Sequence, residues 1–292
     1  MDQSARGALS TTPTIAILGA GVAGLCMAIA LKKAGISSFT LYEKSDRVGG
    51  TWYDNSYPGA CCDVPSHLYC FSFEPNPEWS RVFSPQSEIQ RYLQHCAEKY
   101  GLLPHIRFGA EVAGARFDER AGTWRLRTRD GQELTAKVVI SGTGQLNRPH
   151  IPKIPGLEGF QGTRFHSARW SHGHDLRGEN VAVIGNGASA IQFIPCIAPL
   201  TKKLEIFQRS ANWIIPRMDR AYTEREKERF RRFPWLTRLY RDSIYLQLEA
   251  RFLGFFRESR LSKKLEKGAT QYLHAQVPDA RLREVLTPDY PI

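Results

Sequence analysis

Long apolar runs are missing from this sequence. No window approaches the roughly 18 uninterrupted apolar residues of a membrane-spanning helix, so we expect no helix that crosses a bilayer. The opening stretch, MDQSARGALSTT, also lacks the apolar run of a secretory signal peptide. Both absences favour a cytoplasmic protein and make a membrane partner unexpected.

Cysteine is present without the spacing of a metal site or a disulfide framework. The six cysteines include the adjacent pair Cys61 and Cys62, and no two of them form a CxxC pattern. We therefore predict no metal site and expect reduced thiols, most of them buried as small apolar residues.

Acidic residues are outnumbered, 29 against 40 Lys and Arg, which gives a formal net charge of +11. A basic balance suits nucleic acid, an anionic membrane surface or phosphorylated ligands. Beyond residue 216 basic and acidic residues are interspersed, as on a solvent-exposed helix face. We therefore predict no nucleic-acid partner, and the sequence indicates no oligomeric state.

The order strand, helix, strand occurs twice and predicts two βαβ units. The first has strand patterns at 14–19 and 39–45 around a helix at 20–35, and the second has them at 180–185 and 203–210 around a helix at 186–200. Further helices are expected at 85–101, 222–233 and 234–256, and a β-hairpin with an Asp-Gly turn at 121–142.

These patterns predict an α/β fold with two Rossmann-like dinucleotide-binding domains, incomplete in this chain, and a helical C-terminal segment. The expected boundaries are a first dinucleotide-binding domain at 1–150, the first part of a second one at 151–216 and a helical insertion at 217–292. The aromatic, basic helices of that insertion have two interpretations. They pack their apolar stripe onto the domain and the substrate pocket, which we favour, or they dock on lipid.

The first fingerprint is Gly19-x-Gly21-x-x-Gly24, between a strand and a helix. Its glycines permit a tight turn and close approach of the backbone to a pyrophosphate, and the helix N-terminus attracts the phosphates. Glu43 lies about 20 residues on, where a carboxylate accepts hydrogen bonds from a ribose diol and repels a 2′-phosphate. This combination predicts a dinucleotide site that prefers an unphosphorylated ribose.

The second fingerprint is Gly185-x-Gly187-x-x-Ala190. Aligning the two second strands places Gln208 opposite the acidic residue of the first unit, with Arg209 next. A guanidinium binds phosphate oxygens in bidentate fashion, so this site should prefer the 2′-phosphate of NADP. Two sites of different preference suggest two different dinucleotides, so we expect the domain at 1–150 to bind FAD and the domain at 151–216 to bind NADP.

Between the fingerprints lies a third motif, F-x-G-x-x-x-H-x-x-x-W, formed by Phe160, Gly162, His166 and Trp170. With this motif the chain resembles, over nearly its whole length, the flavin-dependent Baeyer–Villiger monooxygenases, which are related to the flavin-containing monooxygenases. The next residue is Ser171, where that family usually has Pro or Asp.

The resemblance implies a set of site residues. It gives Asp63 a role beside the flavin and nicotinamide, and His166 and Trp170 a role in the interdomain motif. Cys61 stands where the family commonly has Arg, which removes a charged donor. The implied FAD residues are Gly19, Gly21, Gly24, Glu43, Gly49, Gly50, Thr51, Trp52, Tyr53, Asp54, Asp63 and Tyr69. The implied NADP residues are Cys61, Cys62, Asp63, Gln145, Gly185, Asn186, Gly187, Ala188, Ser189, Ala190, Ile191, Gln192, Arg209 and Ser210.

The implied reaction uses NADPH, FAD and O2 to insert one oxygen next to a ketone carbonyl, giving an ester or lactone. Family members stabilise the reacting groups with an Arg found shortly after a Tyr-Pro dipeptide, and this sequence stops just after Tyr290 and Pro291. We therefore expect the main catalytic Arg to be absent and this chain to be impaired or inactive.

There are three alternatives to this function. N- or S-oxygenation is disfavoured because the flavin-containing relatives typically carry Tyr at the position of Trp170. A non-catalytic FAD-binding remnant remains open. A flavin disulfide reductase needs a CxxC or CxxxxC pair, which the six cysteines do not form.

Overall fold

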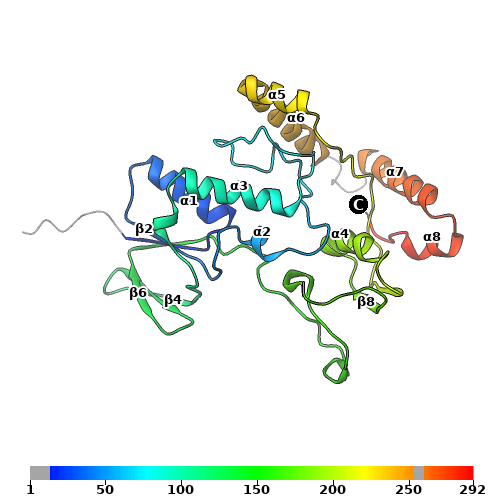
Figure 1. Ribbon diagram of the computed structural model, residues 1–292, viewed down its shortest axis with the longest axis horizontal. Helices are drawn as coiled ribbons and strands as arrows, with labels where there is room; N and C mark the ends of the chain where they lie inside the picture. The colour runs from blue at the N-terminus through cyan, green and yellow to red at the C-terminus, as the bar shows by residue number, and fades with distance from the viewer. Residues whose placement is uncertain (1–13, 253–259, 292) are drawn as a thin grey trace, which may run out of the picture. The chain divides into compact units, whose positions relative to one another are not determined.

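The computed structural model describes residues 14–252 and 260–291. The chain divides into two compact units. The first unit comprises Met1–Asn55 with Ile89–Gly159, and the second comprises Ser56–Glu88 with Phe160–Ile292. Figure 1 follows the elements in chain order by colour. Across the described ranges, no helix is both long and apolar enough to cross a membrane.

A four-stranded parallel sheet organises the first unit, in the order β3-β2-β1-β7. The strands and helices of this layer are β1 (Ile15–Leu18), α1 (Val22–Lys33), β2 (Phe39–Tyr42), α2 (Thr51–Asp54), most of α3 (Gln86–Lys99), β3 (Ile106–Arg107) and β7 (Val138–Ser141). Residues such as Ile17 and Leu41 are fully buried, as expected for parallel strands covered by other elements. The first predicted βαβ unit is therefore confirmed.

The first unit also contains a three-stranded antiparallel sheet of β4 (Val112–Asp118), β5 (Thr123–Thr128) and β6 (Glu133–Ala136). The hairpin between β5 and β6 turns at Asp130 and Gly131, where Gly131 has a φ of 88°. This hairpin was predicted, whereas β4 was not. The side chains of β4 are mostly exposed or half-buried, so the strand lacks the apolar alternation that marks a strand in sequence.

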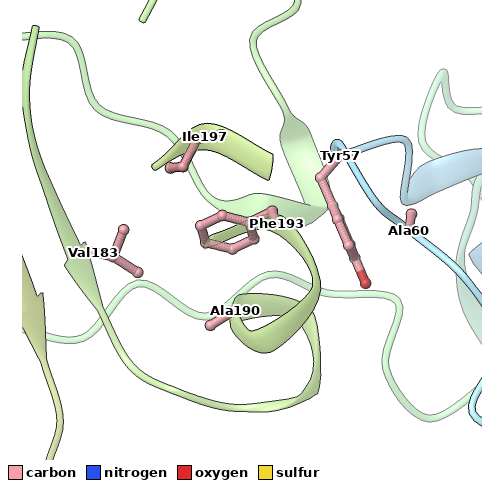
Figure 2. Packing of buried hydrophobic residues seen from close by; sticks show 6 residues of the cluster. All are labelled: Tyr57, Ala60, Val183, Ala190, Phe193 and Ile197. Atoms are coloured by element: carbon pink, nitrogen blue, oxygen red, sulfur yellow. The ribbon is translucent and has the colours of Figure 1, made fainter. Parts of the chain in front are cut away.

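The second unit repeats the βαβ arrangement with β8 (Asn180–Ile184), α4 (Ala188–Ile197) and β9 (Lys203–Phe207), the two strands pairing in parallel. Its core joins this motif to the loop that follows Ser56. Figure 2 shows the buried cluster, in which Phe193 of α4 lies beside Tyr57. The members of the cluster are Tyr57, Ala60, Val183, Ala190, Phe193 and Ile197.

Four helices follow β9 among the described residues: α5 (Glu224–Arg232), α6 (Pro234–Phe252), α7 (Arg260–Gln276) and α8 (Ala280–Leu286). Helix α5 begins with a capping box between Thr223 and Glu226, which satisfies backbone N–H groups of its first turn. The first two helices were predicted, although the end of the second prediction, 253–256, lies outside the described residues. Helices α7 and α8 lie within the helical segment expected at 217–292, although no individual helix was predicted at their residues.

Candidate functional site

The turn between β1 and α1 has a geometry that only glycine permits at two positions. Gly19 has a φ of 97°, and a Cβ there would lie 2.7 Å from the Gly142 carbonyl oxygen. A Cβ on Gly24 would lie 1.9 Å from the Gly19 carbonyl oxygen. Helix α1 begins after Gly21 without a side-chain cap, so its first N–H groups are open to a ligand.

The segment 49–54 lies directly against this turn. The Gly49 amide donates to the Ala20 carbonyl at 3.0 Å. Gly50 has a φ of 56°, and a Cβ on it would lie 3.0 Å from the Gly21 Cα atom. Helix α2 starts at the next residue, so the structure brings Thr51, Trp52, Tyr53 and Asp54 into the same neighbourhood as the first fingerprint.

Glu43 follows β2 and is only 3% exposed. Its Oε2 accepts from the Ala20 amide at 2.7 Å, and its Oε1 accepts from the Ser45 amide at 2.9 Å. Each carboxylate oxygen has about two acceptor positions, so each retains one after these bonds. The strand tip therefore holds a fixed, buried carboxylate beside the first turn.

The turn between β8 and α4 has the same backbone arrangement. The Gly185 amide donates to the Phe207 carbonyl at 2.8 Å, and in the first unit the Gly19 amide donates to the Tyr42 carbonyl at 2.8 Å. Gly185 has a φ of 104°, and a Cβ on it would meet nothing within 4 Å. The matching hydrogen bonds align the two strand tips, with Gln208 opposite the acidic residue of the first.

The second strand tip differs in charge and exposure. Asn186 Nδ2 donates to Gln208 Oε1 at 3.1 Å and to the Ser210 carbonyl at 2.9 Å. Arg209 and Ser210 are exposed. Within residues 14–252 and 260–291, the Arg209 guanidinium has no hydrogen-bond or ion-pair partner. A cation at this tip is thus available to an anionic ligand.

The loop that carries Cys61, Cys62 and Asp63 contacts α4 through Gln192. Gln192 Nε2 donates to Asp63 Oδ1 at 3.0 Å, and Gln192 Oε1 accepts from the Cys61 amide at 3.2 Å. The Cys62 thiol is buried, and this burial raises its pKa to about 11. Tyr69 is half-buried in the same unit, whereas Gln145 lies exposed after β7 in the first unit.

The third motif packs on α4. His166 caps the short 3-10 turn Ser167–Arg169, its Nδ1 accepting from the Ala168 amide at 3.1 Å. The Trp170 ring lies 5.3 Å from the ring of Phe193. Since only this single turn separates His166 from Trp170, the two side chains do not share the face of an α-helix.

The chain is similar to known proteins over nearly its whole length. The flavin-binding monooxygenase-like family model matches residues 12–266. The chain belongs to this family. A Baeyer-Villiger monooxygenase of Pseudomonas aeruginosa is 47% identical over 293 residues, which cover 98% of this chain and 56% of the relative. This flavin-binding monooxygenase-like chain therefore spans little more than half the length of that relative.

Solved structures agree with the assignment. A steroid monooxygenase in its oxidised form bound to NADP is 32% identical, with a TM-score of 0.81. The match covers 97% of this chain and 61% of the steroid monooxygenase chain. OTEMO in a complex with FAD and NADP is 28% identical, with a TM-score of 0.82. The match covers 97% of this chain and 62% of the OTEMO chain. The fold is thus the α/β fold predicted from the two βαβ patterns.

Sequence reasoning missed two arginines in this flavin-binding monooxygenase-like chain. Arg217 Nη1 donates to Cys61 Sγ at 3.0 Å, and its Nη2 donates to the Cys62 carbonyl at 2.9 Å. Arg241 Nη1 donates to the carbonyls of His67, at 3.0 Å, and Leu68, at 2.7 Å. No local motif marks either arginine, because each contacts a segment more than 150 residues away in sequence.

Proposed function

We propose that this chain binds FAD and NADPH and belongs to an enzyme that inserts one oxygen of O2 next to the carbonyl of a small-molecule ketone, giving an ester or lactone. The observation that carries the proposal is the contrast between the two strand tips beside turns that share a matching hydrogen bond. The tip of β2 carries the buried carboxylate of Glu43, and the tip of β9 carries the exposed guanidinium of Arg209. The relatives named above support the ketone chemistry.

The residues of the first turn fit FAD. Gly19 and Gly24 let the turn pack closely against backbone atoms, Gly21 places no side chain in the way of a pyrophosphate, and the free N–H groups of α1 supply donors. The remaining acceptor positions of Glu43 suit a ribose diol and disfavour a 2′-phosphate. We place this function in the FAD-binding domain at 1–150.

The residues of the second turn fit NADP. A Cβ on Gly185 or Gly187 would meet nothing within 4 Å, so the pyrophosphate has room to approach α4. Arg209 supplies a bidentate donor and Ser210 a hydroxyl for the 2′-phosphate. We place this function at 151–216 and assign 217–292 to a helical insertion that holds the loop after Ser56.

When bound, FAD supplies the redox chemistry with O2 and NADPH supplies the hydride. The contribution of the chain is to bind and orient. The two turns hold the pyrophosphates, and the strand tips select the sugars. Asp63 presents a carboxylate whose direction is set by Gln192.

The proposal is tested by purifying the chain with added FAD and measuring bound flavin, the dissociation constants of NADPH and NADH, and product formation. We expect stoichiometric flavin, preferential binding of NADPH, and any oxygenation to yield ester or lactone from a cyclic ketone. An amine and a sulfide serve as competing substrates. Lack of flavin uptake, equal binding of both nucleotides, or oxygenation of only the amine or sulfide would contradict it.

Replacing Arg209 with glutamine should weaken NADPH binding by about 10- to 100-fold, because charge-assisted hydrogen bonds contribute about 1.5–3 kcal/mol each. NADH lacks the 2′-phosphate, so its affinity should change by less than about threefold. Isothermal titration of both nucleotides measures the difference. Arg225→Gln, at an exposed position on α5, is the matched control. An equal loss of affinity for both nucleotides would remove Arg209 from the 2′-phosphate site.

A further inference from the structure

One side-chain amide fastens the loop 57–63 to α4. Gln192 Oε1 accepts from Tyr57 Oη at 3.0 Å and from the Cys61 amide at 3.2 Å. Gln192 Nε2 donates to the Cys61 carbonyl at 3.1 Å and to Asp63 Oδ1 at 3.0 Å. A glutamine amide has two acceptor and two donor positions. All four are therefore directed at the same short loop.

The loop approaches the helix closely enough for these bonds to form. Gly59 has a φ of 78°, and a Cβ on it would lie 2.6 Å from the Gln192 carbonyl oxygen and 2.8 Å from Cys196 Sγ. Only glycine permits both this conformation and this approach. Tyr57 and Ala60 complete the contact through the cluster in Figure 2. Backbone and apolar packing thus hold the loop near α4, and the amide sets its orientation.

The Asp63 carboxylate depends on this amide for its direction. The carboxylate is exposed, so packing does not fix it. Arg217 binds Cys61 Sγ and the Cys62 carbonyl and lies 4.7 Å from the centre of the Phe83 ring, which secures the preceding backbone. Among the described residues, Gln192 is the one side chain that donates a hydrogen bond to the carboxylate of Asp63.

We propose that Gln192 is a positioning residue that orients the Asp63 carboxylate from the helix that begins at the second turn. Helix α4 starts at Ala188, so Gln192 lies about one turn from the N–H groups assigned to the dinucleotide. Occupancy of that turn and the direction of Asp63 are thereby linked through one rigid element. This role rests on the proposed function, in which Asp63 acts on the nicotinamide side.

The first test measures docking of the loop without any cofactor. The alkylation rate of the half-buried Cys61 is compared with that of the half-buried Cys26 of the first unit in the same molecules, by mass spectrometry. Gln192→Met removes all four hydrogen bonds at similar size, and Gln192→Glu removes only the two donors. Because four hydrogen bonds to the loop are lost, the ratio of the Cys61 rate to the Cys26 rate should rise about tenfold or more in Gln192→Met. Gln94→Met on the surface of α3 should leave this ratio unchanged.

The second test separates orientation from binding. In Gln192→Glu loaded with FAD, the NADPH dissociation constant should stay within about threefold while the rate of flavin reduction falls at least about tenfold, because a misdirected carboxylate affects the reacting geometry more than affinity. A purely structural role would change both quantities together or neither. An unchanged Cys61 ratio, or an unchanged reduction rate, overturns the inference. If the chain takes up no FAD, the proposed function fails, and the Cys61 ratio still decides whether Gln192 holds the loop.

Discussion

Replacing Gly24 with alanine is expected to destabilise the first unit by about 3 kcal/mol or more. The added Cβ would lie 1.9 Å from the Gly19 carbonyl oxygen and 3.0 Å from its carbonyl carbon. Both are backbone atoms of a turn already constrained by the close contact of Gly19 with Gly142. Neither can move as a flexible side chain would, so β1 and α1 must separate and lose buried area.

Amide hydrogen exchange of peptides from β1 and α1 measures this effect, and peptides from β8 and α4 report on the second unit within the same sample. Gly187→Ala is the matched control, because Gly187 has a φ of −72° and a Cβ there would meet nothing within 4 Å. Its exchange should remain that of the parent chain. Unaltered protection of β1 and α1 in Gly24→Ala would show that the turn accommodates a methyl group.

Acidification from pH 7 to pH 4 is expected to destabilise the second unit by on the order of 3 kcal/mol through His67 alone. The ring of His67 is 1% exposed, and neither ring nitrogen has a hydrogen-bond partner within the described part of the chain. It is packed among the rings of Tyr222, Phe230 and Tyr240. This burial disfavours the imidazolium and lowers the pKa of His67 from 6.5 to about 4.

The direction of the effect follows from which state binds the proton. Above about pH 6.5 the imidazole is neutral in both the folded and unfolded chains, and the contribution to stability is at its maximum. As the pH falls from about 6.5 toward 4, His67 binds a proton in the unfolded chain but stays neutral in the folded chain, so the free energy of unfolding decreases. The pKa of Glu226 is lowered to about 2, first by its hydrogen bond with Arg220, so its own contribution is lost only below about pH 4.5.

Urea denaturation between pH 4 and pH 8, followed by exchange of peptides that cover 65–71 and α5, isolates the contribution of His67. His67→Phe fills the same aromatic surroundings without a titrating group, so it should remove most of the decline between pH 6.5 and pH 4.5. His150→Gln, at an exposed position in the first unit, should leave the decline intact. A parent chain as stable at pH 4.5 as at pH 7 would show that the protonated ring is accommodated.

Local sequence patterns were sufficient for the elements that form both turns. Gly19, Gly21 and Gly24 and their counterparts near Gly185 lie within a few residues of the strands and helices that they connect, so spacing alone reveals them. The strand tips could be aligned for the same reason, and the matching hydrogen bonds at Gly19 and Gly185 confirm that alignment.

Contacts between distant segments could not be predicted in this way. His67 lies in a loop without a recognisable motif, and its burial depends on aromatic residues of α5 and α6. Arg217 lies 156 residues from Cys61 in sequence, and Arg241 lies 174 residues from His67. The periodicity of α6 indicates a helix, but it does not predict which of its side chains contacts the loop around His67.

The matching hydrogen bonds at Gly19 and Gly185 have a consequence for how cofactor preference can diverge. Because both turns share the same main-chain hydrogen bond, the discrimination that we propose between the two sugars resides in a few side chains at the end of a strand. On this proposal, a βαβ unit of this kind can exchange its nucleotide by point substitution while its backbone is kept. Placing Gln208, Arg209 and Ser210 at the tip of β2 would measure how much of the preference for a 2′-phosphate these three residues determine.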